Sequence, residues 1–444
     1  MSINSNNKPT FSLCTLGCKV NQYESQSIAE DFQRLGFVLS DFSSVCDVYV
    51  INTCTVTGES DKKSRQMIRR ARKTGGNSAI VIAAGCFTQA QKDKLSEIKE
   101  LDAAFGNTDK SKIAKLANEL YMSEKNGFIN RVEDIQNAVL YEDMKINGSE
   151  RTRAFVKIVD GCENKCSYCI IPSVRGKIRS RHPDKIKEEL VGLSNAGYKE
   201  IVLTGIETAA YGKDLANFDL SDLLADADKI DGIERIRLGS LEPTVIKEKF
   251  IDTVKNCKHI VPHFHLSLQS GSDAVLRKMR RKYNTCMFYD TVTKLKQSIP
   301  NICLTTDIIV GFPGETDEMF DETCNFLRKC EFLYAHIFPY SKRAGTDAAV
   351  MPEQVPENIK KHRASVLKEI MLETRHQVLK GFDGFETEVL FEEMTQDGFY
   401  IGHTPNFIEA KLINEVSCNL ESQIVKCRLI YDPSTCDYML CELI

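Results

Sequence analysis

The chain has 444 residues, of which 42% are hydrophobic, so it can bury a core in each of two or three domains. Its 58 Lys and Arg and 62 Asp and Glu give a net charge of −4, which excludes a basic field over the whole molecule. The longest apolar run, residues 79–87, is shorter than the roughly 18 residues of a membrane-spanning helix, and the polar N-terminus does not resemble a secretion signal. We therefore expect no membrane helix and a cytoplasmic protein.

From residue 11 to residue 105, short apolar runs alternate with helical patterns. Strands are predicted at 11–16, 47–52, 79–84 and 102–105, and helices at 21–35, 58–73 and 89–100. This alternation predicts an α/β domain with a parallel sheet. The polar segment 125–151 lacks periodicity and is interpreted as a linker.

A second and longer βα series begins at residue 154. Strands are predicted at 155–159, 201–204, 235–239, 263–269, 302–310 and 334–338, with helices between them. Six such units predict a partial (βα)6 barrel, whose site would lie at the carboxyl ends of its strands. A helix at 357–380 closes the series.

From residue 386 onward, five short strand patterns follow one another: EVLFEE, GFYIGHT, NFIEAKL, IVKCRLIY and DYMLCELI. They predict a small all-β barrel of OB-like size, a type of module that often binds RNA. A purely structural cap is the alternative interpretation.

Seventeen cysteines are an unusual number for a chain without a secretion signal, in which they are expected to be thiols. Cys162, Cys166 and Cys169 form a C-x-x-x-C-x-x-C run directly after the first strand of the second series. Three thiolates bind three irons of a 4Fe–4S cluster and leave one iron open for a chelating ligand. Zinc is the alternative, but it needs a fourth ligand, and the nearest candidate is His182.

This run, with Tyr168 before its last cysteine, resembles the radical S-adenosylmethionine (SAM) superfamily. The resemblance implies a 4Fe–4S cluster whose open iron binds SAM, and reductive cleavage of SAM to a 5′-deoxyadenosyl radical.

Three further cysteines, Cys18, Cys54 and Cys86, each lie just past the end of a predicted strand of the first series. Because parallel strands bring these ends to one edge of the sheet, the three thiols are expected to be neighbours and to hold a second cluster. Buried structural thiols are the alternative, and this interpretation is preferred for Cys14 and Cys46.

Along nearly the whole chain, the sequence resembles the methylthiotransferase family of radical SAM enzymes. The motifs GCKVNQYES and DGCENKCSYCIIPSVRG, with GSLEP, LSLQSGSD, DIIVGFPGETDE and IFPYSKRAGTDA, are most similar to the branch that acts on N6-threonylcarbamoyladenosine in tRNA. Ile178 departs from the pattern, where an acidic residue is expected. The resemblance implies an N-terminal domain at 9–124 with an auxiliary cluster, a radical SAM core at 148–380 and an RNA-binding TRAM domain at 381–444.

The strand at 263–269 alternates in character, with His263, His265, Ser267 and Gln269 on one face and apolar residues on the other. The polar face is expected to point into the barrel, together with Arg235, Arg237, Thr305 and Asp307. A polar lumen indicates a polar ligand, and for His263 a hydrogen-bonded structural role is preferred over catalysis. The residues assigned to SAM from these strands and the resemblance are Tyr168, Gly205, Ser240, Glu242, Gln269 and Asp307, although Gly205 is as well explained as a turn residue.

Three basic segments are candidate RNA contacts, although most charge runs are solvated surfaces. One is the helix DKKSRQMIRRARK, with Arg65 and Arg69, and a second is LRKMRRKY. The third alternates Arg175, Lys177, Arg179 and Arg181, which an extended chain would place on one face. Tyr340 is a further candidate contact. One arginine of the third segment, or Arg65 or Arg69, is expected to bind the carboxylate of the modified base.

The resulting hypothesis is methylthiolation of C2 of N6-threonylcarbamoyladenosine next to the tRNA anticodon. The alternatives are isopentenyladenosine tRNA, a ribosomal-protein aspartate, or a non-catalytic RNA-binding iron–sulfur sensor. The expected cofactors are two 4Fe–4S clusters and SAM, and the expected partners are the anticodon stem-loop, an electron donor of flavodoxin or ferredoxin type and a sulfur source. A monomer is expected.

Overall fold

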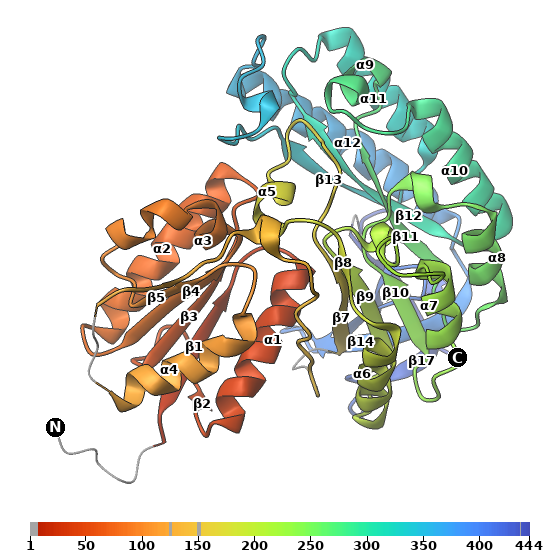
Figure 1. Ribbon diagram of the computed structural model, residues 1–444. Helices are drawn as coiled ribbons and strands as arrows, with labels where there is room; N and C mark the ends of the chain where they lie inside the picture. Colours follow the sequence, from red (N-terminus) through yellow and green to blue (C-terminus); the bar gives the residue numbers. More distant parts are fainter. Residues whose placement is uncertain (1–7, 124–126, 149–151, 436) are drawn as a thin grey trace.

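The computed structural model describes residues 8–123, 127–148, 152–435 and 437–444. Three parts follow one another along the chain (Figure 1): an N-terminal sheet with its helices, a central part of two sheets with their helices, and a C-terminal barrel packed against the central strands. Lys125 and Arg151, the ends of the predicted linker, lie outside the described residues. In the part of the chain that the structure describes, no helix is both long and apolar enough to cross a membrane.

The N-terminal part is a six-stranded sheet in the order β2-β1-β3-β4-β5-β6, and every pair in it is parallel. Its central strands β3 and β4 are buried along their whole length, as expected for a parallel sheet covered on both faces. The strands are β1 (Thr10–Thr15), β2 (Val38–Leu39), β3 (Val48–Thr53), β4 (Ile80–Gly85), β5 (Ala103–Phe105) and β6 (Ile129–Arg131). The helices are α1 (Lys19–Arg34), α2 (Gly58–Gly75), α3 (Cys86–Ala90) and α4 (Ile113–Met122).

Two predictions for this part are wrong. The helix predicted at 89–100 is instead one turn of α3 followed by a 3₁₀ segment, Lys92–Glu97. The side chain of Gln89 donates to the carbonyl of Glu133 at 2.8 Å, and Leu95 is fully buried, so tertiary contacts determine the conformation here. The predicted linker also begins with β6, which pairs with β5 and extends the sheet.

The central part contains the six predicted parallel strands in sequence order, with helices between them. They form two sheets, which two isolated bridges connect: Ile236 pairs with Ile260, and Leu241 pairs with Leu266. The predicted partial (βα)6 barrel is confirmed. The strands are β7 (Arg153–Asp160), β9 (Glu200–Gly205), β10 (Arg235–Leu238), β11 (His263–Gln269), β12 (Cys303–Val310) and β13 (Tyr334–Pro339), and a short antiparallel β8 (Arg179–Ser180) pairs with β7. The helices are α5 (Ile171–Arg175), α6 (Pro183–Asn195), α7 (Leu220–Ala227), α8 (Glu248–Asn256), α9 (Asp273–Lys278), α10 (Thr285–Ser298), α11 (Asp317–Cys330) and α12 (Glu357–Lys380).

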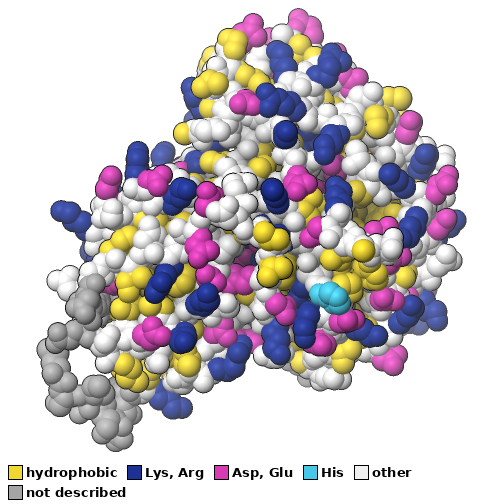
Figure 2. Space-filling view, viewed as in Figure 1, with side chains coloured by type: hydrophobic (Ala, Val, Ile, Leu, Met, Phe, Trp, Pro, Cys, Tyr) yellow, Lys and Arg dark blue, Asp and Glu magenta, His cyan; other side chains and the backbone are white. Residues whose placement is uncertain are grey.

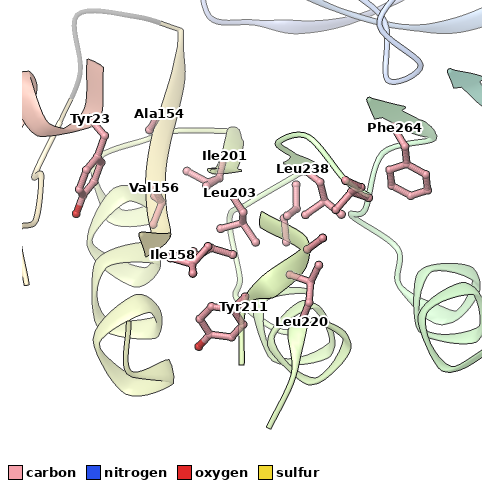
Figure 3. Close-up of a cluster of buried hydrophobic side chains, with 14 of the residues drawn as sticks. Tyr23, Ala154, Val156, Ile158, Ile201, Leu203, Tyr211, Leu220, Leu238 and Phe264 are labelled. Carbon is pink, nitrogen blue, oxygen red and sulfur yellow. The ribbon is translucent and has the colours of Figure 1, made fainter. Parts of the chain in front are cut away.

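Helix α1 belongs to the N-terminal sheet but also packs against β7 of the central part. Tyr23 of α1 lies in the same buried apolar cluster as Val156, Ile158, Ile201 and Leu203 (Figure 3). All five side chains are at most 1% exposed. The shared core fixes the position of the N-terminal sheet relative to the partial barrel.

The C-terminal part is the predicted all-β module, a closed five-stranded barrel in the order β14-β15-β16-β18-β17. Inward-facing residues such as Val389, Phe391 and Leu429 are completely buried. The strands are β14 (Glu386–Met394), β15 (Tyr400–His403), β16 (Glu409–Leu412), β17 (Ile424–Ile430) and β18 (Met439–Leu443).

Candidate active site

Cys162, Cys166 and Cys169 lie in the loop between β7 and α5 and line a cavity of about 550 Å³. Backbone hydrogen bonds hold the loop: the amide of Cys162 donates to the carbonyl of Gly176 at 3.0 Å, and that of Ser167 donates to Met279 at 3.1 Å. Three thiols around one cavity fit a 4Fe–4S cluster with one open iron. His182, the candidate fourth ligand of a zinc site, instead caps helix α6 and does not line this cavity.

The environment of these thiols favours ligation over free nucleophilic reactivity. Burial raises the pKa of the Cys162 thiol to about 12, and the negative charge of Glu207 adds to this effect. A thiol with a raised pKa is a poor nucleophile, whereas a bound metal stabilises its thiolate. Arg281 donates to the Sγ of Cys166 at 3.2 Å and pairs with Glu242 at 3.1 Å, so one cation neutralises charge at the edge of the site.

Cys18, Cys54 and Cys86 follow the neighbouring strands β1, β3 and β4, and the structure brings them together at one sheet edge. Gly17 packs tightly on Cys54: its φ is +100°, and an added Cβ would lie 2.9 Å from the Sγ of Cys54. The Sγ of Cys86 accepts from Asn107 at 3.5 Å. These three thiols fit the second predicted ligand set.

Cys14 and Cys46, for which a structural role is preferred, pack in or against the apolar cluster on one face of the N-terminal sheet. Cys46 is 4% exposed, and its neighbours in that cluster include Tyr49 and Phe42. Their burial matches a packing role.

Arg175 connects the two cysteine sites. It is completely buried, and its guanidinium contacts Glu24 at 2.6 Å, Asp160 at 3.1 Å and the Sγ of Cys86 at 3.4 Å. Arg175 ends helix α5, which begins two residues after Cys169. The segment that follows the Cys162–Cys169 loop thus places the charge of Arg175 against Cys86 of the second cysteine triad.

The prediction of an extended strand with all basic side chains on one face is wrong. Arg175 is helical, and Gly176 turns the chain with a φ of +72°, so the four side chains diverge. Arg179 donates to the carbonyls of Arg175 and Lys177. Arg181 is buried and pairs with two carboxylates, Glu189 and Asp143. Since Arg175, Arg179 and Arg181 are all at most 3% exposed and already bonded, their predicted contact with RNA is corrected.

Arg65 and Arg69 are exposed on α2, the helix that begins four residues after Cys54. The guanidinium of Arg65 lies 4.9 Å from the ring centroid of Phe87, and Arg69 lies 3.7 Å from Glu100. Both remain available to a phosphate. On the face in Figure 2, Lys and Arg side chains are interspersed with Asp and Glu, so basic contacts there are local.

Tyr340, also predicted to contact RNA, is instead buried at 4% exposure and packs edge-on against Phe312 at 5.5 Å. Tyr168 also packs edge-on against Phe312, and their ring centroids are 6.4 Å apart. These aromatic residues form a wall beneath the first cysteine loop. The surface role predicted for Tyr340 is therefore corrected.

The residues assigned to SAM differ in accessibility. Ser240 is exposed, whereas Glu242 is buried and bonded to Arg281. An added Cβ on Gly205 would lie 2.3 Å from Cγ1 of Val159, so packing alone already requires glycine there. Gln269 ends β11 with a φ of +73°.

The predicted alternation along β11 is confirmed: Phe264, Leu266 and Leu268 are completely buried, and the polar residues face the lumen of the partial barrel. There His265 Nε2 lies 3.1 Å from Asp307 Oδ2, and one ligand atom each of His265, Asp307 and His336 lies within 4.8 Å of the others. This donor set can hold a transition metal. His263 is buried, and its Nε2 lies 3.1 Å from the hydroxyl of Thr305, which fits the preferred structural role; burial, with the nearby charge of Arg237, holds its pKa well below the usual value.

The sequence did not indicate that Lys19 and Glu207 lie near the site. It also did not indicate that Arg281 contacts Cys166. Burial and the charges of Arg237 and Arg153 lower the pKa of Lys19 to about 8. Burial and the neighbouring Glu242 raise the pKa of Glu207 to about 7. The available signal was position: Lys19 directly follows a cluster cysteine, and Glu207 lies two residues past a strand end.

Comparisons with known proteins agree with this geometry. Residues 156–327 match the radical SAM superfamily, and residues 10–106 match an uncharacterized protein family, UPF0004. The threonylcarbamoyladenosine tRNA methylthiotransferase MtaB of Bacillus subtilis (strain 168) is 39% identical over 427 residues, 95% of this chain and 94% of that protein. The tRNA-2-methylthio-N(6)-dimethylallyladenosine synthase of Staphylococcus haemolyticus is 35% identical and covers 91% of this chain and 79% of its own.

Among solved structures, the radical SAM methyltransferase TsrM from Kitasatospora setae has a TM-score of 0.57 at 14% identity, with 78% of this chain and 77% of that chain covered. This likeness supports the fold alone. The sequence identity to the methylthiotransferases, over most of the chain, also supports membership of their family. The chain belongs to the methylthiotransferase family of radical SAM enzymes.

Proposed function

We propose that this protein replaces the C2 hydrogen of N6-threonylcarbamoyladenosine by a methylthio group, at position 37 next to the tRNA anticodon. The observation that carries the proposal is the contact between Arg175 and Cys86 at 3.4 Å. Because α5 directly follows the Cys162–Cys169 loop, this contact means that the two cysteine sites face each other across one interface. A substrate base between them would be reached by both.

As a radical SAM methylthiotransferase, the enzyme uses 4Fe–4S clusters and SAM. When bound, these groups supply the radical and sulfur chemistry that side chains lack, since the C2–H bond of adenine offers neither useful acidity nor a leaving group. Cys162, Cys166 and Cys169 would hold the first cluster. Cys18, Cys54 and Cys86 would hold the second.

The surrounding residues position and neutralise these sites. Arg281 keeps positive charge at Cys166, and Arg175 and Asn107 donate to Cys86. Hydrogen bonds to cluster sulfurs and local positive charge are the means by which a protein sets a cluster's potential. Tyr168, Gly205, Ser240, Glu242, Gln269 and Asp307 are retained as the proposed SAM contacts.

The proposed partners are the tRNA anticodon stem-loop, a flavodoxin- or ferredoxin-type electron donor and a sulfur source, for a cytoplasmic monomer. Arg65 and Arg69 are exposed on α2 beside Cys54 and would contact phosphates. The C-terminal barrel would act as a TRAM module for RNA, with domain divisions at 9–124, 148–380 and 381–444.

An isopentenyl group instead of threonylcarbamoyl is the second candidate, because relatives named for dimethylallyladenosine are 35% identical to this chain. The first candidate is preferred because a relative named for threonylcarbamoyladenosine is more similar, at 39% identity over 95% of this chain.

Mass spectrometry of nucleosides tests the proposal. The anaerobically reconstituted enzyme is incubated with SAM, reductant, sulfide and tRNA carrying threonylcarbamoyladenosine, isopentenyladenosine or unmodified adenosine. We expect a methylthio product from the first tRNA, and none when Cys162 is replaced by Ala. Product from the isopentenyl tRNA alone would make the second candidate correct.

A further inference from the structure

A row of aromatic side chains lies along β13, the edge strand of the sheet β11-β12-β13. Tyr334, His336 and Phe338 share one face of this strand, because side chains alternate and the intervening Ala335 and Ile337 pack on the apolar core. Phe338 is 47% exposed and Tyr334 is 42% exposed. Of the Phe and Tyr side chains that the structure describes, only these two are exposed, and adjacent exposed rings are typical of a binding surface.

This aromatic row faces the lumen of the partial barrel. In the parallel pairing of β12 with β13, Asp307 lies beside His336 and Ile309 lies beside Phe338. Paired residues in a sheet share a face, and Asp307 belongs to the polar lumen face, where it lies 3.1 Å from His265. The ring centroids of His265 and His336 are 5.9 Å apart. The rings of β13 therefore border the same lumen as Asp307, one of the proposed SAM contacts.

The segment that follows β13 contacts both cysteine sites. Arg343 Nη2 donates at 2.7 Å to Oγ1 of Thr55, which directly follows a cysteine of the second triad. The amide of Ala348 donates at 2.8 Å to the carbonyl of Ser167, in the first cysteine loop. Phe338 is the ring of the row at the carboxyl end of β13, so it lies at the end of the strand that leads to both sites.

The three rings differ in what they already contact. The guanidinium of Arg375 lies over the ring of Tyr334, 5.9 Å from its centroid, and Tyr334 meets His336 edge-on at 4.8 Å. The planes of His336 and Phe338 are inclined by only 27°, with centroids 6.2 Å apart. Two nearly parallel rings suit a planar ligand, and stacking on aromatic side chains is the usual way in which a protein holds an unpaired nucleobase.

We propose that the adenine base at position 37 of the tRNA stacks on the ring of Phe338, with His336 beside it. This inference rests on the proposed function, from which it takes the tRNA base as the planar ligand. The adenine of SAM is the competing ligand. The residues proposed for SAM lie between the loop after β7 and β12, however, whereas β13 is an edge strand, which a macromolecule can reach.

The test measures binding of labelled anticodon stem-loops by fluorescence anisotropy, with reconstituted enzyme and without SAM. Three RNAs differ only at position 37: threonylcarbamoyladenosine, adenosine and an abasic site. For F338A we expect affinity for the first two RNAs to fall about tenfold and affinity for the abasic RNA to stay unchanged. F338W should restore most of the loss. F338L should not, because Leu is apolar but has no π face.

The matched control is Y334L, a change on the same face of the same strand at a similarly exposed ring, but at the amino end of β13. It should leave the affinity for all three RNAs unchanged. A base-dependent loss in Y334L but not in F338A would overturn the proposal. Equal weakening of all three RNAs by F338A would also overturn it, because Phe338 would then act on the RNA backbone or on the fold.

Equilibrium dialysis with labelled SAM separates the two adenines. F338A that binds SAM more weakly, but all three RNAs as the wild type does, would assign the ring to SAM and overturn the proposal. Product formation by the wild type would leave the proposed function standing in that case. Base-dependent loss in F338A, in a wild-type background that does not methylthiolate the modified RNA, would support the stacking site and refute the proposed function.

Discussion

Replacing Arg175 by Gln tests the interface that joins the two cysteine sites. Arg175 is completely buried with Glu24 and Asp160 as partners, at 2.6 and 3.1 Å. Removing one member of a buried ion pair costs about 3–5 kcal/mol, because the remaining charges lose their compensation. Glu24 keeps Lys110 and Lys157, so we expect the lower end, about 3 kcal/mol.

The measurement is urea unfolding of the cluster-free protein, followed by far-UV circular dichroism because the chain has no Trp. Iron content and reductive SAM cleavage of the reconstituted variant are measured in parallel. R175Q should unfold at lower urea and lose iron from the Cys18, Cys54 and Cys86 site, while SAM cleavage persists. R175K keeps the charge but loses the planar guanidinium, so its urea midpoint and iron content should lie between those of R175Q and the wild type.

A matched control is R428Q, since Arg428 also has two carboxylate partners but lies at the surface, 45% exposed. Its urea midpoint should stay near that of the wild type, as for most exposed ion pairs. Wild-type stability together with a full iron complement in R175Q would refute the connecting role of Arg175.

Three other predictions follow from the site and the barrel interface. Replacing Cys162, Cys166 and Cys169 together by Ala should leave about half of the roughly eight irons bound after reconstitution, and one zinc without sulfide in the wild type would contradict two clusters. The pKa of His263 lies well below 6.5, so the unfolded chain takes up a proton that the folded protein refuses. Stability should therefore fall as pH drops from about 7.5 to 5.5, by at most about 1.4 kcal/mol per pH unit, and H263F should flatten that slope in urea midpoints. Phe407 stacks on His263 at 4.6 Å and under Arg237 at 4.7 Å, so F407A should lower the free energy of unfolding by about 2 kcal/mol.

Phe407 also changes the expectation for a truncated chain. Deleting residues 381–444 should weaken tRNA binding, but it would also uncover Arg235, Arg237 and His263, which are at most 5% exposed. Loss of SAM cleavage in the truncated protein would therefore not locate the cofactor in the C-terminal barrel. F407A is the cleaner variant, because unchanged stability would show that the two parts pack independently.

The sequence predicted those features that depend on strand order and alternation. Each of Cys18, Cys54 and Cys86 follows a strand, and parallel strands necessarily bring such positions to one edge. The polar lumen face of β11 followed from its period of two. Local patterns of this kind survive folding because the backbone geometry of a strand fixes which way each side chain points.

What the sequence could not predict depends on contacts between distant segments. Lys19 directly follows Cys18 and Arg175 lies six residues after Cys169, and the sequence offers no reason to treat these two basic residues differently. The structure separates them through their acidic neighbours: Glu24, 151 residues away, bonds to Arg175, whereas no carboxylate bonds to Lys19 among the described residues. Burial with a partner makes one cation structural. Lys19 has no such carboxylate bond, so the difference between the two cations comes from long-range contacts that no local sequence pattern encodes.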